Sequence, residues 1–289
     1  MKRKNLKLIV GTLFITCIAG VITACGSENT VAGDVTISGS SALLPLVESS
    51  VEGFNEKYSN ININAQAGGS GTGLTQVSDG TVDIGNSDIF AEEKLGKDKV
   101  AELKDHEVVA QGFAVVVNKE LGIDNLTKQQ IKDIFSGKIT NWKQVGGIDK
   151  DIFVIHRPSS SGTRATFVKT ILDGDKNLEN DSMGATQDSN GAVKKAMEEN
   201  KGAVSYLGLS YLNSDDAKAS LIGVKIDGVS YDKENITNGK YPFWSWGHMY
   251  TKGDPNEQTK DFIDYIQSED NRKTVEELGF ISSTDMKVK

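Results

Sequence analysis

Four segments of the chain show the same succession of hydrophobic and polar positions. Each begins with an apolar strand pattern, continues with a loop of small polar residues and, in most cases, ends with a helical pattern. In the first segment Val35 and Ile37 alternate as in a strand, and the apolar positions within 43–54 recur at helical spacing. Three more segments follow the plan: ININAQAGGSGTGLTQVSDG from 61, TVDIGNSDIF from 81, and DIFVIH from 151 with RATFVKTIL after it. Strands that alternate with helices predict an α/β fold with mostly parallel sheets.

A small polar loop follows each of these four strands. Ligands of open α/β sheets bind beyond the carboxyl ends of the strands. The four loops are therefore predicted to meet at one ligand site, which no single loop would indicate by itself.

Further along the chain, other segments indicate where helices begin and end. Thr127 and Gln130 have the spacing of a capping box, and Gly137 is expected to end the helix that follows. The tail from 257 to 279 is predicted to form two helices. The aromatic stretch YPFWSWGHMY at 241–250 is interpreted as packing or a hinge rather than as a ligand site.

The first 24 residues indicate a secretory signal peptide, because a basic start is followed by an apolar run. The letters ITAC at 22–25 resemble a bacterial lipobox, so Cys25 is the expected lipidation site and the first residue of the mature chain. The alternative, an uncleaved membrane anchor, fits less well because about 17 apolar residues lie at the low edge of a membrane span. Cys17 is a weaker candidate for cleavage, and residues 25–34 are interpreted as a tether.

Net charge argues against nucleic acid as a partner. The 289-residue chain carries −8, and loss of the signal peptide removes four basic residues and no acidic one, which leaves −12. Nucleic-acid binding calls for a basic face. If Cys25 carries lipid, the mature chain has no other cysteine for a disulfide or a thiol metal site.

The loop SSSGTR at 159–164 has the composition of an anion site. Amide N–H groups at a helix N-terminus attract negative charge, and small residues let an anion approach closely. The expected donors are Arg157, Ser161, Gly162 and Thr163. The alternative is an ordinary serine cap with arginines that face solvent. The loop GGSGTG at 68–73 is a weaker signal, since it matches neither the P-loop nor the dinucleotide motif.

Enzyme chemistry has little support in the sequence. No G-x-S-x-G motif occurs, and His106, His156 and His248 lack metal-ligand spacing. His156 ends a strand and is interpreted as a structural residue rather than a base. A hydrolase with Ser161 as nucleophile stays open, although no base lies near it in the sequence. We therefore predict no catalysis, no cofactor and no metal site.

Five segments in order resemble those of the phosphate-binding proteins of high-affinity phosphate ABC importers: GSSALLPL, GGSGTGLTQVSDGTVDIGNSD, IFSGKITNWKQVGG, RPSSSGTRATF and GAVSYLGLSYL. The resemblance extends from about residue 35 to 281. It implies a two-lobed periplasmic-binding-protein fold of type II, in which each lobe is a mostly parallel sheet flanked by helices and the ligand lies in the cleft between lobes. It assigns 35–112 and 240–289 to lobe 1, and 113–239 to lobe 2.

The same resemblance implies which residues bind phosphate. They are Ser41, Ala42, Ser70, Asp88, Arg157, Ser161, Gly162 and Thr163. Relatives carry an aspartate two residues after the arginine, where this chain has Ser159, so another group must orient Arg157. Arg164 is expected either to add positive charge or to face solvent. Asp88 is expected to accept a hydrogen bond from a protonated ligand; the alternative is a helix cap or a pair with an arginine.

The function that this resemblance implies is that of a receptor, anchored by lipid at the outer face of the cell membrane. It would bind inorganic phosphate and deliver it, as a monomer, to the permease and ATPase of an ABC importer. Three alternatives stay open: a receptor of the same fold for sulfate or molybdate, the Ser161 hydrolase, and a surface adhesin or signalling lipoprotein without a ligand.

Overall fold

The computed structural model describes residues 32–288, which belong to one compact unit. The predicted signal peptide, Cys25 and most of the predicted tether lie outside these residues. Within 32–288, no helix is long and apolar enough to cross a membrane.

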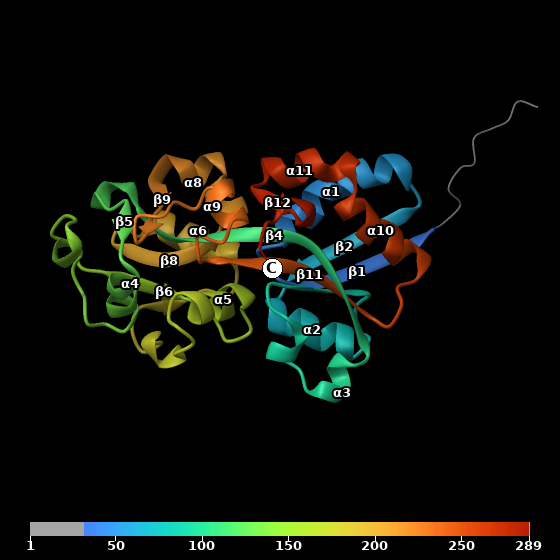
Figure 1. Cartoon of the computed structure of the whole chain (residues 1–289), viewed down its shortest axis with the longest axis horizontal. Helices are drawn as coiled ribbons and strands as arrows, with labels where there is room; N and C mark the ends of the chain where they lie inside the picture. The colour runs from blue at the N-terminus through green and yellow to red at the C-terminus, as the bar shows by residue number, and fades with distance from the viewer. Residues whose placement is uncertain (1–31, 289) are drawn as a thin grey trace, which may run out of the picture. The chain divides into compact units, whose positions relative to one another are not determined.

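Ten strands form one sheet (Figure 1). Eight of them lie in the order β2-β1-β3-β11-β4-β8-β6-β7, while β9 and β12 also pair with β4. Their bounds are β1 Gly33–Gly39, β2 Ile61–Ala67, β3 Ile84–Ser87, β4 Leu103–Asn118, β6 Phe153–His156, β7 Ala185–Thr186, β8 Ala203–Gly208, β9 Leu221–Gly223, β11 Trp244–Lys252 and β12 Phe280–Ser282. A second, two-stranded sheet pairs β5 Asn125–Leu126 with β10 Lys225–Ile226.

Helices connect most of these strands. The α-helices are α1 Leu44–Lys57, α2 Ser70–Ser78, α3 Lys97–Val100, α4 Lys128–Phe135, α5 Gly162–Thr170, α6 Asn190–Glu199, α7 Leu209–Leu212, α8 Asp215–Ser220, α9 Lys233–Thr237, α10 Glu257–Gln267 and α11 Arg272–Glu277. Short 3₁₀ helices are η1 Ala91–Glu93, η2 Lys119–Leu121, η3 Trp142–Val145, η4 Lys176–Leu178, η5 Glu269–Asn271 and η6 Ser283–Asp285.

The predicted α/β class is confirmed, and the sheet is more mixed than the sequence indicates. β1 is parallel to both β2 and β3, and β6 is parallel to both β7 and β8. Between these two parallel parts, β4 and β11 run antiparallel to each other, and each also runs antiparallel to its outer neighbour. The middle of the sheet is therefore antiparallel because two long strands cross it in opposite directions.

The predicted helix boundaries follow local chemistry. Thr127 and Gln130 form a reciprocal capping box at the start of α4. Gly137 lies two residues beyond the end of α4 with φ +81°, a left-handed conformation that favours glycine. α1 has a proline in its first turn, where a missing N–H costs nothing, and buries Leu46, Val47 and Phe54.

β4 contributes to two separate hydrophobic cores. Its earlier residues Val108 and Val109 pack in one core with Phe54 of α1 and Phe262 of α10. Its later residues 113–117 belong to a larger core that includes buried residues of β6, β8, α4 and α5. β4 therefore joins two parts of the fold that each bury their own apolar surface.

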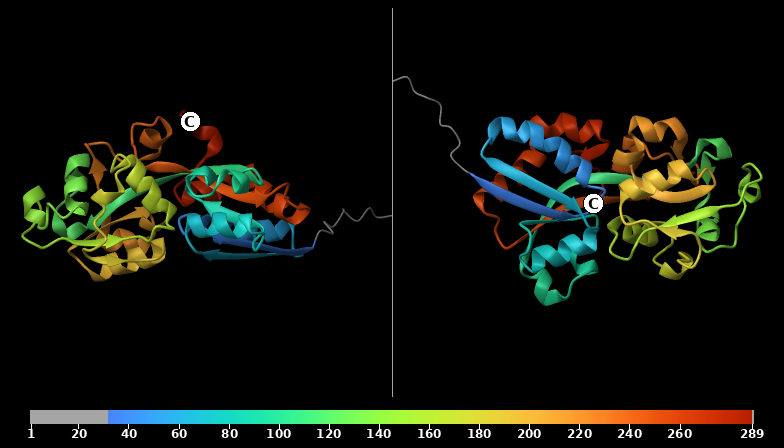
Figure 2. Two further views of the ribbon diagram at one scale, coloured as in Figure 1. Left: turned by 90° about the horizontal axis from the view of Figure 1, so that it is seen from below. Right: turned by 180° about the vertical axis from the view of Figure 1, so that it is seen from behind.

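Helices cover both faces of β1 and β2. Figures 1 and 2 show α1, α10 and α11 on one face and α2 on the other. Leu74 and Val77 of α2 form a small third core with Tyr250 of β11.

The aromatic stretch at 241–250 packs as predicted. Tyr241 and Phe243 are fully buried, and the Tyr241 hydroxyl donates a 2.9 Å hydrogen bond to the Phe113 carbonyl. The Phe113 and Phe243 rings lie 5.2 Å apart. These contacts hold the segment before β11 against β4, at the place where the two strands pass between the cores.

Candidate functional site

A buried arginine lies where the polar loops meet. Arg157 directly follows β6 and is only 1% exposed. Its Nη2 donates to the Ser41 hydroxyl at 3.3 Å and to the Asp188 carbonyl at 3.1 Å. Its Nε and Nη1 have no hydrogen-bond partner among the described residues. Burial lowers the pKa of Arg157, and the nearby charge of Asp88 opposes this shift. The group still carries its charge at neutral pH, and these two nitrogens offer three N–H groups to an acceptor.

Ser41 connects the loop after β1 to the opposite half of the site. Its Oγ accepts from Arg157 and also from the backbone N–H and the side-chain amide of Asn190, at 3.1 and 3.0 Å. The neighbouring Ala42 is fully buried, and its N–H donates to the Ser40 hydroxyl at 3.1 Å. Both residues predicted in this loop therefore lie at the site, although the Ala42 N–H already has an acceptor.

Asp88 lies at the centre of the same cluster and is 3% exposed. Its Oδ1 accepts from the Ser40 hydroxyl and, at 2.8 Å, from the Gln111 amide; its Oδ2 accepts from the Thr163 hydroxyl at 3.3 Å. Burial raises the pKa of Asp88, and the hydrogen bonds from Ser40 and Gln111 oppose that rise. A carboxylate has room for about four hydrogen bonds, so Oδ2 can still accept one more.

Neither alternative interpretation of Asp88 describes these contacts. The bonds to its carboxylate come from side chains rather than from a helix N-terminus. Within residues 32–288, Asp88 forms no ion pair with an arginine at 4.0 Å or less. Arg157 acts on it through its charge instead.

The first turn of α5 packs directly against the loop of α2. A Cβ on Gly162 would lie 2.0 Å from the Ser70 hydroxyl and 2.8 Å from an oxygen of Asp88, so only glycine fits there. The Ser70 hydroxyl itself accepts from the Asp88 N–H at 2.9 Å. Nearby, the Gly71 N–H donates to the Ser160 carbonyl at 2.9 Å. All four predicted loops therefore meet at one place.

Ser161 has the capping role that the alternative interpretation gave it. Its hydroxyl accepts from the Arg164 N–H at 3.1 Å and caps α5. The first N–H groups of a helix have no partner inside the helix. The serine cap of the alternative interpretation is therefore present, but Arg157 is buried and Arg164 is paired with carboxylates, so neither arginine faces solvent as that interpretation expected.

Sequence reasoning missed three residues of the cluster. They are Ser40, Gln111 and Asn190. Gln111 could have been found, because it is a lone polar residue inside the apolar run of β4. Asn190 lies at the start of α6, where its amide also donates to the Thr163 hydroxyl at 3.3 Å. In the sequence, the only signal for this residue was its position at the start of a helix.

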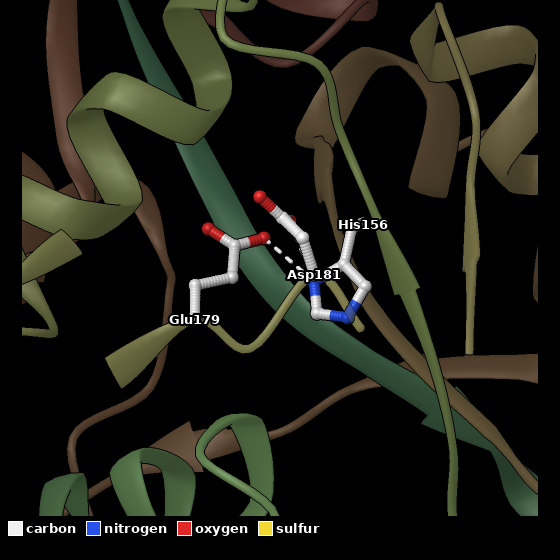
Figure 3. A group of neighbouring side chains, drawn as sticks. All are labelled: His156, Glu179 and Asp181. Carbon is white, nitrogen blue, oxygen red and sulfur yellow. Dashed lines mark hydrogen bonds and ion pairs between the residues drawn. The ribbon is translucent and has the colours of Figure 1, made fainter. Parts of the chain in front are cut away.

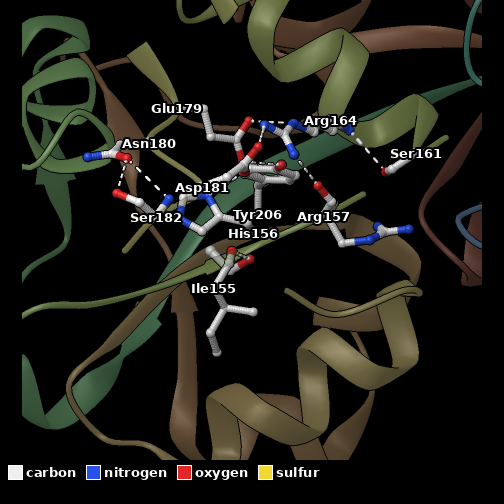
Figure 4. Close-up of polar contacts among 11 residues, drawn as sticks. Ile155, His156, Arg157, Ser161, Arg164, Glu179, Asn180, Asp181, Ser182 and Tyr206 are labelled. Carbon is white, nitrogen blue, oxygen red and sulfur yellow. Dashed lines mark hydrogen bonds and ion pairs between the residues drawn. The ribbon is translucent and has the colours of Figure 1, made fainter. Parts of the chain in front are cut away.

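Arg164 neither joins the anion cluster nor faces open solvent. Its Nε lies 3.0 Å from Glu179 Oε2, and its Nη2 lies 2.8 Å from Asp181 Oδ2. Figure 4 shows the Arg157 side chain pointing away from this acidic group, whereas Arg164 lies against it. Ser159, at the position where an aspartate was expected, is exposed. The Asp188 carbonyl and Ser41 hold the Arg157 guanidinium instead.

His156, Glu179 and Asp181 bring three potential metal ligands within 4.8 Å of one another (Figure 3). His156 lies 23 positions before Glu179, so spacing gave no signal for the group. His156 Nδ1 lies 3.0 Å from Glu179 Oε1, which fits the structural role expected of this histidine. Arg164 already pairs with both carboxylates. We therefore treat the group as an ion-pair network rather than as a metal centre.

A family model and individual relatives both identify the family of this chain. The family model for the PBP superfamily domain matches residues 26–270. The phosphate-binding protein PstS of Bacillus subtilis is 45% identical over 100% of this chain and 97% of its own length. PstS of Staphylococcus saprophyticus is 28% identical over 86% of this chain and 80% of its own.

Solved structures agree. One from Clostridium perfringens, described as a phosphate ABC transporter substrate-binding protein with bound phosphate, has a TM-score of 0.78 and 32% identity, and covers 86% of this chain and 99% of its own. An ABC-type phosphate transport receptor from Vibrio cholerae has a TM-score of 0.65 and 27% identity, with the same coverage. The chain therefore has the two-lobed fold of the PBP superfamily and belongs, within it, to the PstS family of phosphate-binding proteins.

Proposed function

We propose that this protein is an extracytoplasmic receptor that binds inorganic phosphate and delivers it to an ABC importer. The names of its relatives support this function. The observation that carries it is the buried Arg157, whose Nε and Nη1 have no partner among the described residues and which lies within a cluster of hydroxyl groups. Such a cluster binds an oxyanion without any covalent chemistry.

The proposed phosphate ligands are the eight residues that the resemblance implies. They are Ser41, Ala42, Ser70, Asp88, Arg157, Ser161, Gly162 and Thr163. Micromolar affinity requires about 8 kcal/mol. Hydrogen bonds that involve a charged group contribute about 1.5–3 kcal/mol each. A handful of such bonds, less the cost of association, reaches this affinity even though the whole chain is acidic.

Calorimetric titration of the purified protein with phosphate, sulfate and molybdate tests the proposal. We expect phosphate to bind most tightly. Replacement Arg157→Ala should weaken phosphate binding about 100-fold or more, because it removes at least two charge-assisted hydrogen bonds worth about 3 kcal/mol together. Arg272→Ala, which removes an arginine paired with Asp285, should leave the affinity unchanged.

If titration with phosphate gives no heat of binding, this function is excluded. Preference for sulfate or molybdate would instead favour the second candidate, a receptor of the same fold for another oxyanion. Equal small effects of Arg157→Ala and Arg164→Ala would mean that the anion is held by other groups.

A Ser161 hydrolase is the alternative of a different class. The Ser161 hydroxyl caps α5, and Nδ1 of the nearby His156 is engaged by Glu179. A general base must lie within hydrogen-bond reach of the nucleophile, and no hydrogen bond links these two side chains. Turnover assays on phosphate and carboxylate esters separate this candidate from a receptor.

The membrane attachment and the partners belong to the same proposal. We propose a lipid on Cys25 after removal of residues 1–24, a permease and an ATPase as transport partners, and a monomeric receptor. Mass spectrometry of the mature protein checks the lipid, and an unmodified Cys25 would exclude the anchor. We also keep the division into lobe 1 (35–112 and 240–289) and lobe 2 (113–239), which the two separate cores on β4 support.

A further inference from the structure

An ion-pair network lies directly behind the loop that carries Arg157. Glu179 is its centre, and we call it the Glu179 network. Its members are His156, Arg164, Glu179, Asp181 and Tyr206. Figure 4 shows these side chains converging from β6, α5, β8 and the segment after η4.

Glu179 is a buried charge with several partners. Its side chain is 0% exposed, although it lies in a segment of mostly polar residues. Its Oε1 accepts from the Tyr206 hydroxyl at 2.8 Å and lies 3.0 Å from His156 Nδ1. Its Oε2 lies 3.0 Å from Arg164 Nε. A buried carboxylate is costly to desolvate unless it is paired, so this one needs the Arg164 cation.

The network reaches the binding loop at two points. Arg164 Nη1 donates a hydrogen bond to the backbone carbonyl of Arg157. His156, which Glu179 also contacts, is the residue immediately before Arg157. Glu179 therefore holds the backbone from which the Arg157 side chain extends toward the cluster.

Among residues 32–288, the Arg157 side chain forms no ion pair with a carboxylate at 4.0 Å or less. Its Nη2 donates to a serine hydroxyl and to a backbone carbonyl of these residues. The direction of the guanidinium depends on these two contacts and on how firmly the backbone at 157 is held.

We propose that Glu179 is a positioning residue of the phosphate site, which acts through Arg164 to hold the Arg157 backbone in place. This inference rests on the proposed function. In the described part of the chain, the polar partners of the Glu179 carboxylate are His156, Arg164 and Tyr206 rather than residues of the anion cluster, so its effect on binding is indirect.

The test compares phosphate affinity with stability in the same variants. Glu179→Gln keeps the size of the side chain and removes the charge. We expect its dissociation constant for phosphate to rise about tenfold or more, the range seen when outer-shell partners of a bound ion are removed. Arg164→Lys keeps the charge but cannot bond two carboxylates and the 157 carbonyl together, and we expect a comparable loss.

A double variant tests the route. If Glu179 acts through Arg164, Glu179→Gln combined with Arg164→Lys should bind phosphate no more weakly than the weaker single variant, because contacting residues are not additive. Asp181→Asn is the matched control. It removes a carboxylate from the same guanidinium, but one that is 56% exposed, and exposed pairs contribute little. We expect its affinity to stay within about twofold.

Each outcome is decisive. An unmodified protein that does not bind phosphate overturns the proposed function and, with it, this inference. If the unmodified protein binds and Glu179→Gln lowers the unfolding temperature but binds within twofold, Glu179 is only structural. If the fold-losses of phosphate affinity in the two single variants multiply in the double variant, the route through Arg164 is excluded. If Glu179→Gln does not fold, the Arg164→Lys variant replaces it in the test. Phosphate affinity within twofold of the unmodified protein would then overturn the inference.

Discussion

Two buried residues of opposite charge, Arg157 and Asp88, carry the chemistry that we propose for the site. Arg157 offers N–H donors to an anion. Asp88 offers an acceptor, which can bind a protonated anion but repels an anion without a proton. Inorganic phosphate carries at least one proton near neutral pH, whereas sulfate carries none. Oδ2 of Asp88 accepts only from Thr163 in the described residues, so it can also accept from a phosphate hydroxyl.

Asp88→Asn should shift selectivity toward sulfate. An ionised carboxylate near an unprotonated oxyanion adds like charge and an unpaired acceptor in a buried place, and both cost energy. An amide can donate as well as accept, so phosphate binding should be largely retained while sulfate binding improves. Competition titrations at neutral pH measure the ratio of the two affinities. Asp79→Asn, which changes an exposed aspartate, is the control.

Acidification gives a second readout of the same carboxylate. Burial raises the pKa of Asp88, so as pH falls toward that raised pKa the carboxyl gains a proton and becomes a donor. The preference for phosphate should therefore shrink on acidification in the unmodified protein and stay level in Asp88→Asn. Parallel pH profiles for the two proteins would contradict this role.

At the scale of elements, the start of α5 is a tightly constrained contact of the site. Helix N-termini bind anions through free N–H groups, and α5 presents its first turn beside Ser70 and Asp88. Gly162 makes this approach possible, because any side chain at that position would overlap the Ser70 hydroxyl. The contact joins residues that we assign to different lobes.

Gly162→Ala should weaken phosphate binding strongly, by about tenfold or more, while the unfolding temperature without phosphate changes little. The added Cβ would lie 2.0 Å from Ser70 Oγ, so α5 and α2 must move apart and the site opens. Gly96→Ala is the control, because a Cβ there meets nothing within 4 Å and the backbone φ is −69°. Phosphate titration and thermal unfolding measure the two effects. Unchanged affinity in the Gly162→Ala variant would show that this close contact is not needed for binding.

At the scale of the whole molecule, two antiparallel strands connect the separate cores. β4 and β11 pair from Leu103 to Gly112. β4 continues into the larger core, and Trp244 and Trp246 at the start of β11 also pack against that core. Few covalent connections between two cores allow them to move as units, with the hinge at those connections. The polar contacts of the site, such as Arg157 with Ser41, lie between residues of the two proposed lobes.

Phosphate should therefore compact the protein. Small-angle scattering at saturating phosphate is expected to give a smaller radius of gyration than scattering without ligand, because bonds across the site favour the closed arrangement. Gly162→Ala serves as the control, since its lobes should close less at the same phosphate concentration. Equal radii with and without phosphate, together with an open ligand-free form by fluorescence, would contradict lobe closure.

Local sequence patterns determined much of this protein. Alternation at Val35 and Ile37, the capping box at Thr127 and the glycine after α4 each specify an element through contacts within a few residues, so they can be recognised without the fold. Three of the four small loops were predictable as one group for a related reason: β1, β2 and β3 are parallel and bring their carboxyl ends to one edge. β6 runs opposite to them, so only the fold brings its loop to the same place. The resemblance to a known family then supplied residues that the pattern alone left open.

Only the tertiary structure decided how charges are paired. Arg164 meets Glu179 and Asp181 across 15 or more positions of chain, and Gln111 reaches Asp88 from another strand. The antiparallel centre of the sheet was also invisible, because strand direction depends on where the chain crosses between cores. Buried polar groups take whichever partner the packing places within hydrogen-bond reach, and the sequence order carries no record of that distance.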